Sequence, residues 1–315
     1  MKIHSSFDTL KAIRPVVTIG MFDGIHLGHR HLIGKLTGLA QACAGESVII
    51  TFWPHPRVVL NQDADSLRFI TTIEEKTRMM SELHVDHLVL LPFTVQLARY
   101  TAAEFVDKIL VHSVGIHHLL MGFNHRFGKD RSNNYNDYAL LAHQYGFLIS
   151  REDPVSVHGL QCSSSVIRDS LVNGDIATAN LLLGYHYQLA GHVVGGNRLG
   201  RTLGYPTANV ELGDESKLVP ANGVYACRVH TEGRNYHGML NIGKRPTIQS
   251  NASKSSIEVH ILDFNHDIYS EIVVIEFVHR IRDEHKFASL DALKAQLSVD
   301  EKTVRDYFIR HGEVS

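Results

Sequence analysis

The sequence of 315 residues lacks the marks of several protein classes. Its three cysteines are odd in number and widely scattered, which argues against a disulfide framework or a zinc knuckle of paired cysteines. No apolar run is long enough to cross a bilayer, and the amino terminus lacks the apolar core of a signal peptide. The formal net charge of −2 gives no general attraction to nucleic acid or membrane. We therefore expect a cytoplasmic globular protein with neither as a partner.

The length and the hydrophobic pattern predict two domains. In residues 1–184, apolar runs rich in β-branched residues alternate with helical patterns, which is typical of a doubly wound parallel α/β sheet. In residues 185–315, short strands are separated by turns that contain Gly and Asn, and an amphipathic stretch follows over residues 290–307. This pattern predicts an antiparallel β-barrel with a terminal helix.

The most informative segment joins the first long apolar run to a helical pattern. The run ends at Gly20, and His26 and His29 flank Gly28. Histidines three apart lie on one face of a first helical turn, where free N–H groups and the positive end of the helix dipole favour an anion. A structural pair or a metal site are the alternatives, but zinc requires more ligands and no cysteine is close. We expect a phosphate site, with Asp23 holding the turn.

Other polar residues follow later strand ends. Ligands of doubly wound sheets bind beyond the carboxyl ends of the strands, so His26, His55 and Gly122 are expected to line one crevice. Residues 122–131 are basic and polar between two glycines, and by residue type they suit a solvated loop or a ligand loop equally.

A run of three serines at positions 163–165 is suited to capping a helix. Arg168 would then lie in the first turn of that helix, where the dipole disfavours a cation. A bound anion such as a triphosphate would offset that cost.

A glycine-rich, basic segment occupies residues 196–209 and does not have the Walker spacing. Backbone N–H groups of such a loop can cover phosphates. Thr207 and Asn209 face the same side if the segment is extended, and Mg²⁺ bridged to phosphates needs few protein oxygens. A β-turn followed by a helix cap is the alternative. Glu258 and His260 share one face of an alternating strand, and we expect Glu258 to point into the mouth of the barrel as a general base.

With these residues in view, the chain resembles the bacterial bifunctional riboflavin kinase/FAD synthetase family from about residue 15 to residue 307. The resemblance rests on separate motifs in the order that the family has. They are GMFDGIHLGH at 20–29, FWPHP at 52–56, SSSVIR at 163–168, GRTLGYPTAN at 200–209, NIGKRPT at 241–247 and IEVH at 257–260.

The resemblance implies two reactions, with ATP as co-substrate, Mg²⁺ as cofactor, and FMN and FAD as products. The barrel would phosphorylate riboflavin to FMN, with Thr207 and Asn209 on Mg²⁺ and Glu258 as the base. The α/β domain would adenylylate FMN to FAD, with His26, His29 and Arg168 stabilising charge on ATP. The remaining implied contacts are with ATP, at Gly20, Phe22, Asp23, Gly28, Asn124, Ser163, Ser164, Gly200, Thr202, Gly204 and Pro206, and with the flavin, at His55, Pro56 and Arg126.

The chain departs from the family pattern at a few positions. Asn124 and His125 stand where the family commonly has Asp and Phe, Ser132 follows Arg131 in place of a glycine, and Ser270 replaces a glycine. Asn124 keeps an oxygen, whereas His125 is expected to alter the packing of its loop.

Two further functions stay open at this point. The chain would be a flavokinase if the altered loop had weakened the α/β domain, or a flavin-binding regulator if catalysis were lost. The intact His26, His29 and Arg168 argue against the first, and the retained Glu258 argues against the second. We expect a monomer or a weak homo-oligomer.

Overall fold

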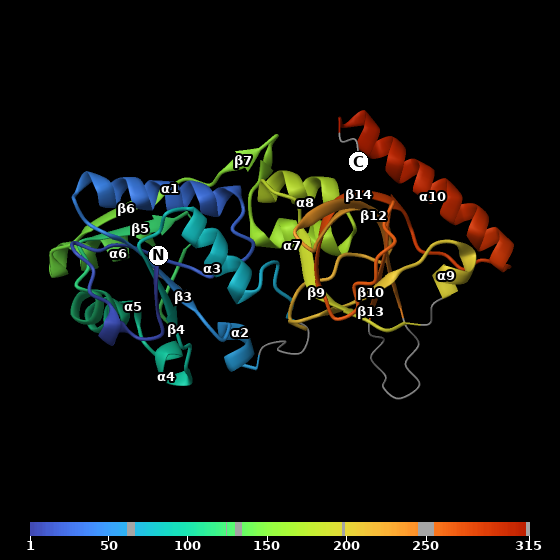
Figure 1. The fold of residues 1–315 in the computed structure, drawn as a ribbon. Helices are drawn as coiled ribbons and strands as arrows, with labels where there is room; N and C mark the ends of the chain where they lie inside the picture. Colours follow the sequence, from blue (N-terminus) through green and yellow to red (C-terminus); the bar gives the residue numbers. More distant parts are fainter. Residues whose placement is uncertain (62–66, 124, 130–133, 197–198, 245–254, 313–315) are drawn as a thin grey trace. The chain divides into compact units, whose positions relative to one another are not determined.

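The structure is a computed structural model that describes residues 1–61, 67–123, 125–129, 134–196, 199–244 and 255–312 (Figure 1). Two compact units make up the chain, Met1–Ser164 and Ser165–Ser315. The boundary expected at residue 184 separates two activities, which this division into compact units does not test. It therefore stays a prediction.

The first unit is built on a six-stranded sheet in which every pair of neighbouring strands is parallel, in the order β1-β4-β3-β2-β5-β6. Its strands are β1 (Lys2–His4), β2 (Val16–Ile19), β3 (Ser47–Phe52), β4 (His87–Leu91), β5 (His118–Gly122) and β6 (Leu148–Glu152). The apolar runs correctly predict the central strands. The two edge strands, β1 and β6, were not predicted, because an edge strand tolerates polar side chains and need not form an apolar run.

Helices separate the strands, as the alternating pattern predicts. They are η1 (Phe7–Thr9), α1 (Leu27–Ala42), α2 (Pro56–Val59), α3 (Ile73–Glu82), α4 (Val95–Ala98), α5 (Ala102–Phe105), the π-helical η2 (Val106–Val114) and α6 (Tyr135–Tyr145). A short hairpin of β7 (Ser156–Val157) and β8 (Leu160–Gln161) ends the unit.

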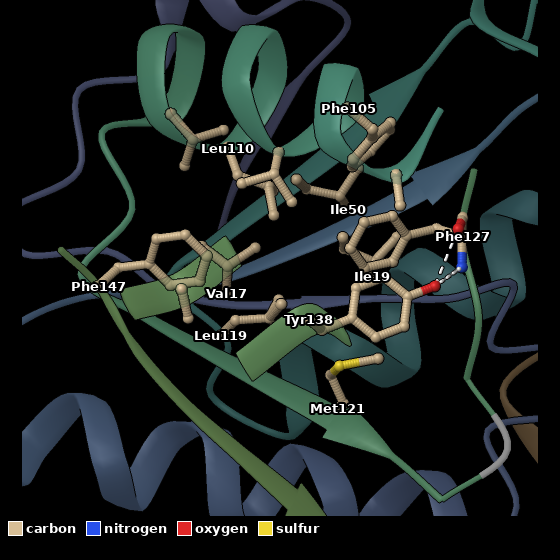
Figure 2. Packing of buried hydrophobic residues seen from close by; sticks show 14 of the residues in the cluster. Val17, Ile19, Ile50, Phe105, Leu110, Leu119, Met121, Phe127, Tyr138 and Phe147 are labelled. Carbon is tan, nitrogen blue, oxygen red and sulfur yellow. Dashed lines mark hydrogen bonds between the residues drawn. The ribbon is translucent and has the colours of Figure 1, made fainter. Parts of the chain in front are cut away.

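One hydrophobic cluster of the first unit lies against one face of the sheet, where helices α5, η2 and α6 pack (Figure 2). Val17 and Ile19 of β2 contribute alternate side chains to it. The hydroxyl of Tyr138 bonds both the backbone N–H and the carbonyl of Phe127, at 3.0 and 2.9 Å. This pair of bonds ties the segment after β5 to helix α6.

The strand order places a topological switch point between β2 and β5. From β2 the chain moves to β3 and β4 on one side, and β5 and β6 are added on the other. Crossovers leave in opposite directions there, so a crevice opens beyond the carboxyl ends of β2 and β5.

The second unit contains a closed barrel of six antiparallel strands in the order β10-β13-β12-β11-β14-β9. They are β9 (Gln188–Val194), β10 (Ala208–Leu212), β11 (Gly223–Thr231), β12 (Arg234–Lys244), β13 (Ser255–Ile261) and β14 (Ile272–Arg282). The unit also has helices α7 (Ser164–Val172), α8 (Ile176–Leu183), α9 (Leu199–Leu203) and α10 (Leu290–Arg310). The predicted fold class, α/β sheet followed by a barrel and a terminal helix, is confirmed.

Helix α10 covers part of the outer wall of the barrel (Figure 1). Its Val304 and Phe308 are buried with Val224 and Met239, which belong to strands β11 and β12. Arg282 at the end of β14 adds a two-pronged ion pair to Asp300 of the helix, with the shortest N–O distance at 2.7 Å. Within the described residues, no helix has the length and apolarity to cross a membrane.

Candidate functional sites

The turn between β2 and α1 is tightly wound and held from a neighbouring segment. Phe22, Gly24 and Ile25 all have positive φ, at 50°, 90° and 37°, a combination that persists only where surrounding contacts impose it. The Asp23 carboxylate supplies those contacts, because its Oδ1 accepts hydrogen bonds from the N–H groups of residues 70 and 71, at 2.9 and 3.1 Å. Asp23 therefore holds the turn, as expected from its residue type.

The two histidines of this turn stack on each other. His26 is the N-cap of α1, and its Nδ1 accepts a hydrogen bond from the His29 N–H at 3.2 Å. The ring centroids are 3.6 Å apart with an interplanar angle of 17°. A side chain at Gly28 would begin 3.1 Å from the His26 ring, so a glycine allows this stacking. The His29 Nδ1 is buried and has no hydrogen-bond partner among the described residues.

Both imidazoles are neutral at pH 7. Burial lowers the pKa of His26 to about 4, although Asp23 opposes the shift. The pKa of His29 is also far below its ordinary value, first because of burial, then because of repulsion from His26 when that ring is protonated and from the Lys76 ammonium. The rings therefore serve as hydrogen-bonding groups and not as cations.

Lys76 belongs to the same site, and the sequence analysis missed it. It lies on α3 and is only 4% exposed, and its Nζ donates to the carbonyl of Met21 at 2.7 Å. A lysine in an amphipathic helix usually marks a solvated face, so the sequence carried no signal for its burial.

The serine segment contacts the same turn from more than a hundred residues away. Ser164, the first residue of α7, donates through its hydroxyl to the backbone carbonyl of Asp23 at 2.8 Å. The carbonyl of Cys162 lies 3.4 Å from where a Gly28 side chain would begin. Ser163 and Ser164 are thus brought to the histidine turn. Arg168 lies further along α7 in the second compact unit, and its role at the histidines stays a prediction.

Three adjacent parallel strands deliver the remaining candidates to one edge of the sheet. Gly20 follows β2, His55 follows β3, and Gly122 ends β5. His55 caps the short helix α2, since its Nδ1 accepts from the N–H of Arg57 at 3.1 Å, and Pro56 opens that helix.

The loop after β5 is described only in part. Asn124 lies outside the described residues, and Arg126 is exposed. Burial lowers the pKa of His125 to about 4, and its Nε2 has no hydrogen-bond partner in the described part of the chain. The departure from Phe thus buries an unsatisfied nitrogen.

In the barrel, strand register assembles the second site. Asn209 of β10 lies opposite Glu258 of β13, and Glu258 lies opposite Asn241 of β12. The hydroxyl of Thr207, just before β10, is 3.5 Å from a carboxylate oxygen of Glu258. Residues about 50 positions apart are thereby neighbours. A side chain at Gly196 would overlap that of Asn209, so Gly196 leaves the space for its amide.

The expected direction of Glu258 was wrong. The alternate residues Ile257, Val259 and Ile261 are buried, whereas Glu258 and His260 on the opposite face are partly exposed. Glu258 therefore lies on the outer wall of the barrel and not in its mouth. Leu262, which shares the Glu258 side, is buried in a cluster with Val304 and Phe308 of α10, so its apolar character did not indicate the barrel interior.

Two cavities adjoin this strand, one on each face. A cavity of about 260 Å³ is lined by Glu258 and His260, by further polar and charged side chains that include Arg282 and Glu284, and by a group of apolar side chains. These apolar residues are Leu203, Tyr205, Val224, Met239, Phe287, Leu293 and Leu297. A second cavity of about 330 Å³ is lined by Val259, Ile261, Arg201 and residues 264–269. Thr207 borders both.

The glycine-rich segment is partly helical and not the continuous loop that was expected. Gly200 and Thr202 lie in α9, and a side chain at Gly200 would overlap the carbonyl of Tyr205. Gly204 then turns the chain with a φ of 87°. The ring of His260 bonds the carbonyl of Pro206 at 2.7 Å, which fixes the approach to Thr207.

Comparisons with known proteins divide the chain in the same way. A family model for FAD synthetase matches residues 10–166, and one for riboflavin kinase matches residues 183–308. Proteins named bifunctional riboflavin kinase/FMN adenylyltransferase are similar over nearly the whole chain. One from Listeria monocytogenes is 35% identical, covering 95% of this chain and 94% of its own, and one from Pseudomonas fluorescens is 36% identical over 92% of each.

A solved structure shares the complete fold. It is that of a Streptococcus pneumoniae protein named macrolide-efflux protein, with a TM-score of 0.87, 33% identity, and coverage of 96% of this chain and 98% of that one. Its name refers to a different activity, whereas the family models and the curated relatives agree with each other.

Proposed function

Because the chain belongs to the bifunctional riboflavin kinase/FMN adenylyltransferase family, we propose that its two sites carry out the two consecutive steps that this name describes. Riboflavin is phosphorylated by ATP at the barrel, in residues 185–315. The FMN formed is adenylylated by a second ATP at the histidine turn, in residues 1–184. FAD and pyrophosphate are the products.

The 260 Å³ cavity suits riboflavin. The apolar and aromatic part of its lining matches a planar tricyclic ring, and Glu258 contributes to the same lining a carboxylate able to accept a proton. In the proposed step Glu258 takes the proton of the ribityl 5′-hydroxyl while its oxygen attacks the γ-phosphorus of ATP. The bond from that phosphorus to the β–γ bridging oxygen breaks, and ADP leaves.

ATP approaches from the other side of the strand. The 330 Å³ cavity meets the riboflavin cavity at Thr207, so a nucleotide there can present its γ-phosphate beside Glu258. The Thr207 hydroxyl and the Asn209 amide are hard oxygen donors, which fits Mg²⁺, and Gly196 leaves room around the amide. When bound, Mg²⁺ would neutralise phosphate charge.

At the histidine turn no general base is required, because the FMN phosphate is already ionised. One of its oxygens attacks the α-phosphorus of ATP, and the bond to the α–β bridging oxygen breaks to release pyrophosphate. Neutral His26 and His29 donate hydrogen bonds to the oxygens on which charge accumulates, and the positive end of the α1 dipole stabilises that charge. Ser163, Ser164 and Arg168 support the ATP phosphates, and His55, Pro56 and Arg126 contact FMN.

The observation that carries the proposal is the cross-strand placement of Asn209 and Glu258, with Thr207 at the border of two cavities. Incubation with riboflavin, ATP and Mg²⁺, with the flavins resolved by chromatography over time, tests it. FMN should appear first and FAD should follow. FMN that is never converted would limit the chain to the kinase, and riboflavin binding without product would leave a flavin-binding protein.

A further inference from the structure

Lys76 is a buried cation with few internal partners. The residues described offer its ammonium one hydrogen-bond acceptor, the carbonyl of Met21, which lies between Gly20 and Phe22 in the histidine turn. An ammonium has three N–H donors, and burial of a charge without full hydrogen bonding is costly. A side chain needed only to fill this space would be apolar.

The surrounding structure fixes where this charge lies. Helix α3 begins at a capping box, in which Thr72 and Glu75 bond each other's backbone N–H groups. The residues just before that box are bonded to Asp23, so the start of α3 and the histidine turn form one hydrogen-bonded assembly. Lys76 is therefore held against the turn by the same carboxylate that shapes it.

The electrostatics of the turn depend on Lys76. Burial lowers the pKa of Lys76 to about 8, with Asp23 opposing the shift, so the ammonium is charged at pH 7. Its charge also lowers the pKa of His29. With His26 and His29 neutral, the positive side chains bonded to this turn are Lys76, at the Met21 carbonyl, and Arg30, whose Nε donates to the Ile25 carbonyl at 3.2 Å. Lys76 is the one of the two that is nearly completely buried.

The geometry points to Lys76 as a further functional residue of the adenylyl-transfer site, one that supplies a fixed, buried positive charge beneath the ATP phosphates. This inference rests on the assignment of FMN adenylylation to the first unit.

The test is steady-state FAD formation from FMN and ATP by the full-length protein. Lys76→Met should lower kcat/KM for ATP by ~10²-fold, comparable with removal of one preorganised charge-stabilising group. Riboflavin phosphorylation by the same protein should be unchanged. Arg78→Met is the matched control, because Arg78 is on the same helix but 58% exposed, and it should have no effect on either reaction.

The pH profile separates a role of the charge from a role in packing. In the wild type, kcat/KM for FAD formation should fall as pH rises through about 8, as the ammonium loses its proton. Asp23, His26 and His29 face this charge, and the pKa values of both histidines are lowered, away from pH 8. Lys76→Arg stays charged, so its profile should remain flat through pH 9.

Wild-type FAD formation by Lys76→Met would overturn the inference, and so would an alkaline fall that persists in Lys76→Arg. The second result is decisive even if the methionine variant unfolds, which fluorescence of Trp53, the single tryptophan, would reveal. A wild-type protein that forms FMN but no FAD would instead refute the assignment of adenylylation itself.

Discussion

The histidine turn and the barrel site achieve phosphate chemistry by different means. At the turn, His26 and His29 are three residues apart and are positioned by one strand end and one helix start. In the barrel, Thr207 and Glu258 are positioned by pairing between strands about 50 residues apart. The first site preorganises neutral donors in a buried, strained turn, and the second places a carboxylate in one cavity, close to a threonine that borders a second cavity. The turn stabilises charge, whereas the barrel must also move a proton.

Glu258→Gln tests the separation most strongly. The amide keeps the size of the side chain but cannot accept the hydroxyl proton, so riboflavin phosphorylation should fall by ~10²–10⁴-fold. FAD formation from supplied FMN should stay within about twofold of the wild type, since no proton is removed there. Chromatography of the flavins measures both.

Glu276→Gln is the matched control, because Glu276 lies on β14 and pairs with Arg228 at 3.4 Å. Loss of both reactions in folded Glu258→Gln would refute the two-site model.

His29→Ala should produce the converse result. Loss of one preorganised donor should lower FAD formation by ~10²–10³-fold and leave riboflavin phosphorylation unchanged. His31→Ala is the control, since His31 is two residues away but 43% exposed and bonded to Glu152 at 3.1 Å. Equal losses in the two variants would mean that the helix start, and not the His29 ring, carries the effect.

The same contrast explains what the sequence could predict. The histidine turn could be predicted because its residues are contiguous. A glycine at a strand end, two histidines three residues apart and a helical pattern each indicate local structure. The pairing of β10 with β13 was not predicted, and the outward direction of Glu258 was missed, because both depend on contacts between segments far apart in the sequence. Lys76 was missed for a related reason: only the fold buries it against Met21. Local motifs are visible in a sequence, but the partners that long-range packing adds to them are not.

The neutral histidines should make the first unit sensitive to acid. In the unfolded chain a histidine gains its proton near pH 6.5, whereas folded His26 does so only at about 4, and the pKa of His29 is also lowered. Between these values the unfolded state binds more protons, so stability is fully present above pH 6.5 and is lost as pH falls toward 4. The loss should reach a few kcal/mol.

Urea unfolding followed by Trp53 fluorescence, at pH 7 and pH 5, measures this loss for the first unit. His26→Gln should reduce the difference between the two pH values, because it removes one of the groups that titrate. An unfolding free energy of the first unit that is the same at pH 7 and pH 5 would show that the histidines are solvated.

The smallest expected effect concerns backbone strain at residues with positive φ, which lie at different places in the two sites. In the first unit, Phe22 and Ile25 hold positive φ within the proposed active site, but in the barrel Ser270 does so, with φ of 68°, beside the Tyr269 that lines the 330 Å³ cavity. Ser270→Gly should remove the left-handed penalty while keeping the bond from its N–H to the Val193 carbonyl. Allowing for the greater entropy of glycine in the unfolded chain, we expect a gain of about 0.5–1 kcal/mol. Thermal inactivation of the kinase reaction reports it, with Ser270→Ala as the control that keeps the Cβ and gains nothing. A gain in the alanine variant equal to that in the glycine variant would mean that the serine hydroxyl, and not its backbone conformation, destabilises this turn.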